Sequence, residues 1–350
     1  MATNVEQKSG APAQANLIGL TKADYRGNKS TLCQGCGHNS ISSQIISACH
    51  EMSISPDKVI KLSGIGCSSK SPAYFMGRSH GFNSLHGRMP TIATGAVLAN
   101  HELKAIGISG DGDTASIGLG HFIHLVRRNV PMVYIVENNG VYGLTKGQFS
   151  ATADQGQELK KMGINPFMPV DICMEALIAK VGFVARSFAG DPKQVKELLK
   201  AALHFKGTAV LDIISPCVTF NNRDASTKSY AWGKEHREPL HDVTWVPKRD
   251  EIEISYKPGE VLDVEMHDGS TLMLKKLQLD YDPKDRIEAL KMLETTCCGG
   301  VLVTGLIYFN EDRPALDELE DLVETPLSRL DAAQMRPPEE SLQDLMGEFR

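Results

Sequence analysis

The chain has 350 residues, of which 41% are hydrophobic and 23% charged, so it is long enough for one large or two medium domains with a sizeable core. Its net charge of −6 argues against a basic nucleic-acid-binding surface, and it has no run of about 18 uncharged apolar residues that predicts a membrane span. Because the N-terminus lacks a basic segment followed by an apolar core, we expect no secretory signal and a cytoplasmic protein.

Strands and helices alternate through the first two thirds of the sequence, after an expected N-terminal arm over residues 1–25. The predicted strands cover residues 57–62, 104–113, 131–139, 183–188 and 208–215. The predicted helices cover residues 38–52, 91–103, 114–129, 171–181 and 192–205, and a long polar loop covers 143–170. Apolar strands separated by helices predict an α/β fold, with a parallel sheet that helices cover on both faces.

The pattern changes after about residue 222, so we expect one α/β domain over residues 26–222 and a smaller C-terminal extension over residues 223–350. In the extension the sequence predicts a hairpin at 251–276 that turns at Asp268-Gly269, a helix at 285–296 and a strand at 301–309. Residues 311–350 hold twelve acidic residues and four arginines, which predicts a solvated helical tail.

Four polar or glycine-bearing loops each follow the end of a predicted strand. Their sequences are GIGCSS at 64–69, SGDGD at 109–113, ENNGVYG at 137–143 and SPCVTF at 215–220. Ligands of a parallel sheet bind beyond the carboxyl ends of its strands. The four loops are therefore predicted to share one edge of the sheet.

The SGDGD loop opens a helix, and its glycines and the helix N-terminus favour a phosphate group. Its two aspartates would repel that phosphate unless a Mg²⁺ ion lay between them. Asp111 and Asn139, on successive loops, supply a carboxylate and an amide oxygen, and turn carbonyls complete a set of hard ligands. The sequence therefore predicts a diphosphate held through Mg²⁺, and it contains neither a Walker loop nor a complete dinucleotide-binding fingerprint.

The chain has eight cysteines, and without a secretory signal a disulfide framework is not expected. Cys49 and Cys173 fall in apolar helical patterns, and the adjacent Cys297 and Cys298 are also assigned to packing. The other four lie in glycine- or proline-bearing loops: Cys33, Cys36, Cys67 and Cys217. Four thiolates suit either Zn²⁺ or a [4Fe–4S] cluster, whereas a thioredoxin-like dithiol would use only the first pair. On the cysteines alone, zinc and an iron–sulfur cluster both stay open.

Gly110-Asp111-Gly112 followed by Asn138-Asn139 resembles the signature of thiamine diphosphate-binding proteins. With the stretches CQGCGH, GIGCSS, LHGR, VYGLTKGQ and PCVTFN, the chain resembles the β subunit of 2-oxoacid:ferredoxin oxidoreductases. The likeness runs from about residue 20 to 240, and more weakly to about 330. It implies a thiamine diphosphate-binding fold and oxidative decarboxylation of a 2-oxoacid.

The resemblance implies that Cys33, Cys36, Cys67 and Cys217 hold a [4Fe–4S] cluster. Decarboxylation of a 2-oxoacid with thiamine diphosphate leaves two electrons that can depart singly, and a nearby cluster, unlike zinc, accepts one at a time. Ferredoxin would receive these electrons and CoA would receive the acyl group, and a low-potential electron donor could drive the reaction in reverse.

The resemblance also assigns residues to the other cofactors. Thiamine diphosphate would be bound by Ile65, Gly66, Cys67, Ser68, His86, Gly112, Asp113, Gly143 and Leu144. Mg²⁺ would be held by Asp111, Asn139 and the carbonyl of Val141.

Two cations near the proposed site, Arg88 and Lys146, bear on the choice of substrate. Either one can pair with the distal carboxylate of a dicarboxylic 2-oxoacid, and a bidentate arginine contact is a strong selector. The expected substrate is therefore 2-oxoglutarate, with a pyruvate-preferring enzyme as the alternative. The residues expected to take part in catalysis are Cys67, His86, Arg88 and Lys146.

One catalytic group is missing from the sequence. Thiamine activation usually needs a glutamate against the aminopyrimidine ring, and Glu137 is expected to face the diphosphate half instead. In the family that the chain resembles, a partner chain supplies this glutamate, so we expect an α subunit in a heterodimer or a dimer of heterodimers. Two other hypotheses are a non-redox thiamine diphosphate enzyme with structural zinc and a non-enzymatic scaffold.

Overall fold

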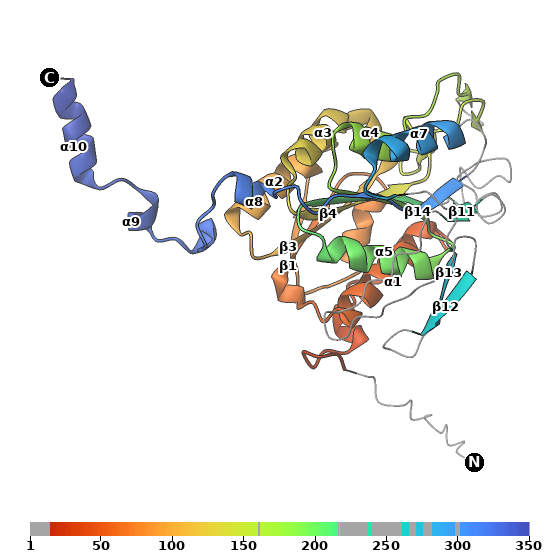
Figure 1. Ribbon diagram of the computed structural model, residues 1–350, viewed down its shortest axis with the longest axis horizontal. Helices are drawn as coiled ribbons and strands as arrows, with labels where there is room; N and C mark the ends of the chain where they lie inside the picture. Colours follow the sequence, from red (N-terminus) through yellow and green to blue (C-terminus); the bar gives the residue numbers. More distant parts are fainter. Residues whose placement is uncertain are drawn as a thin grey trace, which may run out of the picture.

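The computed structural model describes residues 15–159, 162–215, 217, 237–239, 261–265, 271–275, 282–297 and 302–349. Its centre is an eight-stranded sheet with the strand order β11-β14-β9-β10-β4-β3-β1-β2 (Figure 1). The strands are β1 (Val59–Ser63), β2 (His80–Asn83), β3 (Lys104–Gly110), β4 (Met132–Asn138), β9 (Phe183–Phe188), β10 (Thr208–Ile214), β11 (Arg237–Pro239) and β14 (Leu302–Phe309). All neighbouring pairs are parallel except β14 and β9, which are antiparallel. The prediction of a mostly parallel α/β fold is confirmed.

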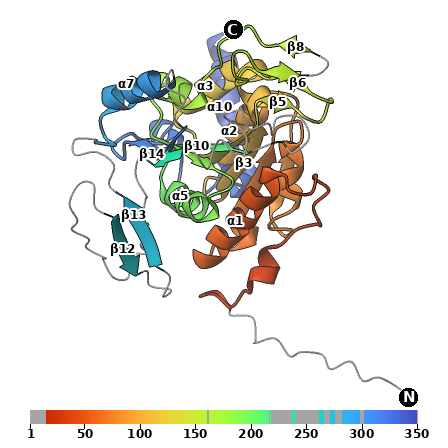
Figure 2. The ribbon, with the colours of Figure 1, turned by 90° about the vertical axis from the view of Figure 1, so that its right-hand side faces the viewer.

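Helices cover both faces of the sheet (Figures 1 and 2). One face carries α1 (Gly37–Glu51) and α5 (Pro192–His204), and the other carries α2 (Met89–Ala99), α3 (Leu119–Arg128), α4 (Ile172–Ile178) and α7 (Arg286–Cys297). On β4, Met132, Tyr134 and Val136 join the core under α2, α3 and α4, whereas Val133 and Ile135 join the core under α1 and α5. Alternate side chains of a strand leave opposite faces, so an entirely apolar strand needs helices on both sides.

Two predicted helices differ from the structure. The 114–129 segment begins as a wide π-helical turn over Gly112–Ile117, in which Gly118 N donates to Asp113 O at 2.9 Å, and becomes α3 only afterwards. The 91–103 segment is helical over Met89–Ala99 and ends where Asn100 takes an extended conformation. The first difference concerns the site, because π turns widen a helix and this one lies directly after β3.

The sequence gives no clear signal for several short elements. These are β2, the hairpins β5 (Val141–Tyr142) with β6 (Gln148–Phe149) and β7 (Glu158–Leu159) with β8 (Gly163–Ile164), and the 3-10 turns η1 (Lys22–Tyr25), η2 (Pro56–Lys58), η3 (Ser68–Ala73) and η5 (Leu327–Arg329). All four residues of β2 are exposed, and the hairpin strands have two residues each. Segments this short or this exposed carry no hydrophobic period.

The predicted C-terminal extension contributes to the main sheet. β14 pairs with β9, so this part of the extension continues the α/β sheet. β12 (Val261–Glu265) and β13 (Thr271–Lys275) pair antiparallel, which confirms the predicted hairpin, although its turn at Asp268-Gly269 lies outside the described residues.

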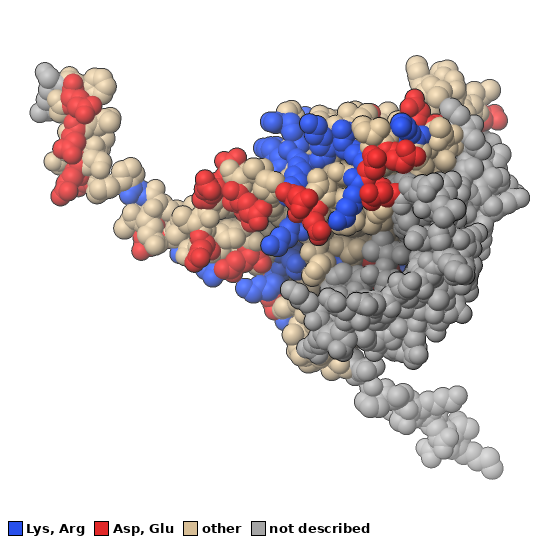
Figure 3. All heavy atoms as spheres, in the orientation of Figure 1, with Lys and Arg blue, Asp and Glu red and all other residues tan. Residues whose placement is uncertain are grey.

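After α8 (Leu316–Leu319) and η5, whose Arg329 pairs with Glu102, the chain leaves the body of the protein (Figure 1). α9 (Ala332–Met335) and α10 (Glu339–Glu348) contain no buried residue, and acidic side chains lie along the surface of this segment (Figure 3). α9 and α10 thus have the solvated, acidic, helical character predicted for residues 311–350, whereas Ala315 and Leu316 of the same stretch are buried.

The beginning of the described chain packs on the body. Tyr25 is fully buried, and Asn16 Nδ2 donates to the Tyr25 hydroxyl at 2.8 Å and to His50 O at 3.1 Å. The last part of the predicted N-terminal arm is thus attached to α1, and residues 1–14 lie outside the described residues. Across the described ranges, no helix combines the length and the apolar character that a membrane crossing requires.

Candidate active site

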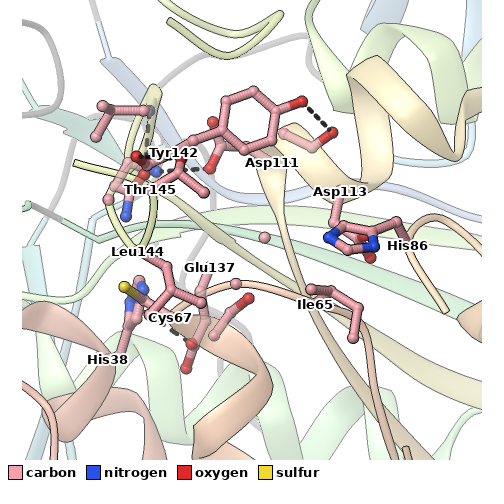
Figure 4. Close-up of a pocket in the computed structure, with 17 residues that line it drawn as sticks. His38, Ile65, Cys67, His86, Asp111, Asp113, Glu137, Tyr142, Leu144 and Thr145 are labelled. Carbon is pink, nitrogen blue, oxygen red and sulfur yellow. Dashed lines mark hydrogen bonds and ion pairs between the residues drawn. The ribbon is translucent and has the colours of Figure 1, made fainter. Parts of the chain in front are cut away.

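A pocket lies at the carboxyl edge of the sheet, where the loops after β1, β3 and β4 meet (Figure 4). Every residue that the sequence assigns to thiamine diphosphate or Mg²⁺ lines this pocket: Ile65, Gly66, Cys67, Ser68, His86, Asp111, Gly112, Asp113, Asn139, Val141, Gly143 and Leu144. The parallel topology explains this convergence, because it turns the carboxyl ends of neighbouring strands to the same edge.

Arg88 and Lys146, the two predicted substrate-binding cations, do not line the pocket. Arg88 is exposed at the start of α2. The pKa of His121 on α3 is lowered, first by the burial of His121 itself and then by the positive charge of Arg88. Lys146 is exposed at the turn between β5 and β6, with a φ of 74°. Arg88 comes two residues after His86, and Lys146 comes directly after Leu144 and Thr145, all of which line the pocket.

Asp111 is a buried carboxylate with hydrogen-bond partners but no salt bridge among the described residues. Its Oδ1 accepts from Asn139 N at 3.2 Å, and its Oδ2 accepts from Thr152 Oγ1 at 2.7 Å and from Ser150 Oγ. Burial raises the pKa of Asp111, and these hydrogen bonds only partly oppose the effect. A divalent cation would supply the missing positive charge, so the site fits Mg²⁺ with Asp111, Asn139 and the Val141 carbonyl as ligands.

Asp113 ties the loop that carries His86 to the turn after β3. Its Oδ1 accepts from Gly87 N at 2.7 Å and its Oδ2 accepts from Ser109 Oγ at 2.9 Å. Figure 4 shows His86 beside Asp113 at one side of the pocket. Because both oxygens of Asp113 are engaged by the protein, this carboxylate supports the wall of the pocket.

Gly112 lets Tyr142 close over the turn after β3. The Tyr142 hydroxyl donates to Gly112 O at 3.0 Å, and a Cβ atom built on Gly112 would lie 2.4 Å from the Tyr142 ring. A residue with a side chain at this position would displace the ring. Glycine at position 112 therefore leaves room for the Tyr142 ring, and it also allows a phosphate to come close to the backbone.

The four cysteines of the predicted cluster gather beside the same pocket. Cys67 lines it, and a Cβ atom built on Gly143 would lie 3.5 Å from Cys67 Sγ and 3.8 Å from Cys217 Sγ. Cys36 interacts electrostatically with Cys67 and Cys217, and Cys67 interacts with Cys33. The turn that joins the first pair is closed by Cys36 N, which donates to Cys33 O at 3.1 Å.

Burial raises the pKa of Cys36 to about 12 and also raises the pKa of Cys67, and neighbouring thiols add to both effects. Holding such thiols as thiolates requires a positively charged centre. Within the described ranges, no three His, Cys, Asp or Glu side chains are close enough to hold one metal ion. Four cysteine thiolates are the ligand set of a [4Fe–4S] cluster, in which each sulfur binds a different iron atom, so the donor chemistry fits that group.

The remaining cysteines behave as packing residues where they are described. Cys49 and Cys173 are both fully buried within the apolar cores, which confirms that prediction. The side chain of Cys297 and the whole of Cys298 lie outside the described residues.

Two further residues of the pocket, His38 and Glu137, carry no assigned role from the sequence. Glu137 is 0% exposed and His38 is 1% exposed, and His38 Nδ1 lies 3.5 Å from Glu137 Oε2. Burial raises the pKa of Glu137 well above its ordinary value and lowers the pKa of His38 to about 4, so both groups favour the neutral form. An acidic residue near the end of an otherwise apolar buried strand is the signal that identifies Glu137 in the sequence.

Comparison with known proteins places this geometry in a family. Residues 64–213 match the family described as thiamine pyrophosphate enzyme, C-terminal TPP binding domain. The chain is 43% identical over 233 residues to "2-oxoacid:ferredoxin oxidoreductase subunit beta" of Saccharolobus solfataricus, covering 66% of this chain and 73% of the relative. It is 35% identical to "2-oxoglutarate synthase subunit KorB" of Methanocaldococcus jannaschii, covering 67% and 87%.

The chain belongs to the family of 2-oxoacid:ferredoxin oxidoreductase β subunits. A solved structure of 2-oxoglutarate:ferredoxin oxidoreductase from Magnetococcus marinus, with 2-oxoglutarate, coenzyme A and succinyl-CoA bound, is similar at a TM-score of 0.74 and 29% identity. The similarity covers 95% of this chain and 99% of that one. This β subunit is therefore part of an oxidoreductase and carries a thiamine diphosphate-binding domain.

The family match also separates two parts of the site. The pocket loops after β1, β3 and β4 all lie within residues 64–213, where the thiamine pyrophosphate enzyme family matches. Of the four loop cysteines of this β subunit, only Cys67 lies in that range, whereas Cys33, Cys36 and Cys217 lie outside it. Three of the four loop cysteines thus lie outside the part of the chain that matches the general thiamine pyrophosphate enzyme family.

Proposed function

We propose that this chain is the thiamine diphosphate-, Mg²⁺- and [4Fe–4S]-binding β subunit of a CoA-acylating 2-oxoglutarate:ferredoxin oxidoreductase. The overall reaction converts a 2-oxoacid, CoA and oxidised ferredoxin to an acyl-CoA, CO₂ and reduced ferredoxin. One observation carries the proposal: the pocket at the carboxyl edge of the sheet adjoins the group of four loop cysteines, and Cys67 belongs to both.

The buried wall of the pocket supports the cofactor assignment. Asp111, Asn139 and the Val141 carbonyl hold Mg²⁺ against the diphosphate, and Asp113 fixes the loop that presents His86. When bound, thiamine diphosphate supplies the carbanion that attacks the 2-oxo carbon of the substrate. This chain orients that chemistry with Ile65, Leu144 and the turn glycines, and it excludes water through the same apolar contacts.

The cysteine group supports electron transfer from that pocket. Cys33, Cys36, Cys67 and Cys217 would hold the cluster, and Cys67 also lines the cofactor pocket. Single-electron acceptance next to the pocket is what a ferredoxin-linked decarboxylation needs. Cys36, Cys67 and Cys217 carry free thiols in the structure, which is the form that ligation of a cluster requires.

Two comparisons support 2-oxoglutarate as the substrate. A relative of 35% identity is named 2-oxoglutarate synthase, and the similar Magnetococcus marinus structure contains 2-oxoglutarate, CoA and succinyl-CoA. Arg88 and Lys146, exposed next to the pocket loops, are the cations that would pair with the distal carboxylate. Relatives named only for 2-oxoacids make a pyruvate-preferring enzyme the alternative.

The pocket also supports the need for a partner α subunit. Its one glutamate, Glu137, lies buried against Ser71 and His38 and is engaged within this chain. A partner chain would therefore supply the glutamate that activates the aminopyrimidine ring, in a heterodimer or a dimer of heterodimers.

The test is to produce the chain with its α subunit and purify the complex without oxygen. We expect a brown protein that contains iron, acid-labile sulfide and thiamine diphosphate. It should reduce ferredoxin with 2-oxoglutarate and CoA at a higher kcat/KM than with pyruvate. A colourless complex that holds zinc would support the non-redox alternative, and higher pyruvate activity would overturn the substrate assignment.

A further inference from the structure

Glu137 contacts two segments that carry cysteines. It is the penultimate residue of β4, and its carboxyl group is fully buried. Ser71 Oγ donates to Glu137 Oε1 at 3.0 Å and to Oε2 at 2.9 Å. Ser71 belongs to η3, the short turn for which Cys67 is the N-cap residue. This bond therefore joins the end of β4 to the segment of Cys67.

His38 extends the contact to the other two segments. Its Nδ1 lies 3.5 Å from Glu137 Oε2 and 2.6 Å from Ser215 Oγ. His38 is in the first turn of α1, whose N-cap residue is Cys36, and Ser215 comes two residues before Cys217. Ser215 N in turn donates to Asn138 O at 2.7 Å, next to Glu137 on β4.

Three segments that are far apart in the sequence are thus linked around a single carboxyl group. They carry Cys36, Cys67 and Cys217, and Cys33 follows through its turn with Cys36. Cys33, Cys36 and Cys67 lie in turns or at helix caps, and Cys217 lies beyond the end of β10 at a bridge residue, so none of them belongs to a strand of the main sheet. Without cross-links, each loop would have to be ordered at the moment of cluster binding, at a cost in conformational entropy.

We propose that Glu137 is a positioning residue that holds the cysteine-bearing segments at the spacing that a [4Fe–4S] cluster requires. The inference rests on the proposed function, because it presupposes the cluster, and it adds a residue to that site. Glu137 contacts no cysteine sulfur in a bond that the structure records, so it acts through Ser71 and His38. Outer groups of this kind typically change metal affinity by about 10- to 100-fold when removed.

The geometry of the Glu137 carboxyl group determines which substitutions can keep its contacts. Two oxygens in one plane accept from Ser71 on one side and contact the His38 ring on the other. A glutamine keeps the size of the side chain and one acceptor oxygen, and its amide adds a donor that can face the ring. A methionine keeps the approximate length but has no strong acceptor. Comparing the two separates hydrogen bonding from space filling.

The experiment uses the αβ complex purified without oxygen, with Glu137→Gln and Glu137→Met variants. Iron release to a chelator is followed with time, and the reduced cluster is examined by electron paramagnetic resonance. We expect Glu137→Met to release iron about tenfold faster than the original protein and to show shifted g values. Glu137→Gln should stay close to the original protein in both measurements.

Asn129 offers a matched control at the opposite edge of the sheet. It is fully buried with a φ of 51°, its Nδ2 donates to Pro314 O at 2.9 Å, and its Oδ1 accepts from Thr208 N at 2.9 Å. Asn129→Gly removes these bonds at a backbone position that glycine tolerates. It should lower the melting temperature while leaving iron release and the g values unchanged.

The outcomes separate the inference from the proposed function. An original complex without iron would refute the cluster itself, and iron release from Glu137→Met at the original rate would refute only the role of Glu137. Equal losses in Glu137→Gln and Glu137→Met would overturn the hydrogen-bond explanation. If Glu137→Met does not fold, Ser215→Ala replaces it, because it removes only the link from His38 towards Cys217 and should release iron faster than the original complex.

Discussion

Cys67 and Cys217, which follow strands that are not neighbours in the sheet, both direct their sulfur atoms towards Gly143. A Cβ atom built on that glycine would lie 3.5 Å from Cys67 Sγ and 3.8 Å from Cys217 Sγ. Cys67 follows β1 and Cys217 follows β10, and β3 and β4 lie between these strands. The loop after β4 therefore lies beside both cysteines, and Gly143 and Cys67 both line the pocket.

The first prediction concerns Cys217 as a cluster ligand. Cys217→Ala removes one of the four sulfurs beside the pocket, so we expect most of the iron to be lost during anaerobic purification. Iron and acid-labile sulfide per αβ unit measure the effect. Cys49→Ala is the control, since Cys49 is fully buried in the apolar core and should cost about 1 kcal/mol in stability without loss of iron. Full iron content in Cys217→Ala would remove that cysteine from the ligand set.

The second prediction concerns Asp111 as a Mg²⁺ ligand. Burial raises the pKa of Asp111, so the neutral amide of Asp111→Asn avoids burying a charge but loses one acceptor oxygen, and the melting temperature of the complex depleted of Mg²⁺ and cofactor should change little. Addition of Mg²⁺ and thiamine diphosphate at about 100 times Kd should stabilise the original complex by about 2.7 kcal/mol. The Asp111→Asn complex should gain far less.

Asp57→Asn is the control for that experiment, because Asp57 is exposed and pairs with Arg78 away from the pocket. It should show the same Mg²⁺-dependent rise in melting temperature as the original protein. A full rise in the Asp111→Asn complex would contradict the assignment of Asp111.

Much of the site follows from the sequence because its loops follow buried, apolar strands. The runs that become β3 and β4 are mainly apolar, which predicts buried parallel strands, and parallel strands place Asp111 and Asn139 at one edge. The cysteine loops needed the family resemblance in addition, since spacing alone leaves zinc and iron–sulfur chemistry equally open. The structure brings all these residues to one pocket and its border.

What the sequence does not predict depends on contacts between distant residues. Ser215 Oγ lies 2.6 Å from His38 Nδ1 although the two residues are 177 positions apart in the sequence, and no local pattern predicts this contact. Glu137 interrupts an apolar strand, but only its contacts with Ser71 and His38 give this a meaning. The π turn after β3 could not be predicted from the sequence either, because its residues are equally compatible with the first turn of an ordinary α-helix.

The third prediction concerns the close contact of Gly112 and Tyr142. In Gly112→Ala the new Cβ would lie 2.4 Å from the Tyr142 ring, so the ring must move and its hydrogen bond to Gly112 O is lost. Overpacking of this kind costs about 1–3 kcal/mol. We expect at least about a tenfold weaker binding of thiamine diphosphate, measured by calorimetry on the αβ complex.

Gly120→Ala is the control for the steric argument. Gly120 lies in α3, and a Cβ atom built there meets no other atom within 4 Å. Since alanine favours a helix interior by up to about 1 kcal/mol over glycine, this variant should be as stable as the original or more so, with unchanged cofactor affinity. Equal cofactor affinity in Gly112→Ala would show that the ring can move at no cost to the pocket.

The fourth prediction concerns Arg88 and the selection of a dicarboxylic substrate. Arg88 follows Gly87, whose N–H is bonded to Asp113, so its backbone is fixed at the border of the pocket although its side chain lies outside. A charge-assisted contact with the distal carboxylate contributes about 1.5–3 kcal/mol, so Arg88→Ala should lower kcat/KM for 2-oxoglutarate by about tenfold or more. Activity with pyruvate, which has no second carboxylate, should change little.

Arg128→Ala, on the last turn of α3, controls for a general loss of positive charge. Equal losses with both substrates in Arg88→Ala would show that Arg88 does not read the distal carboxylate, and Lys146→Met would then be the variant to compare.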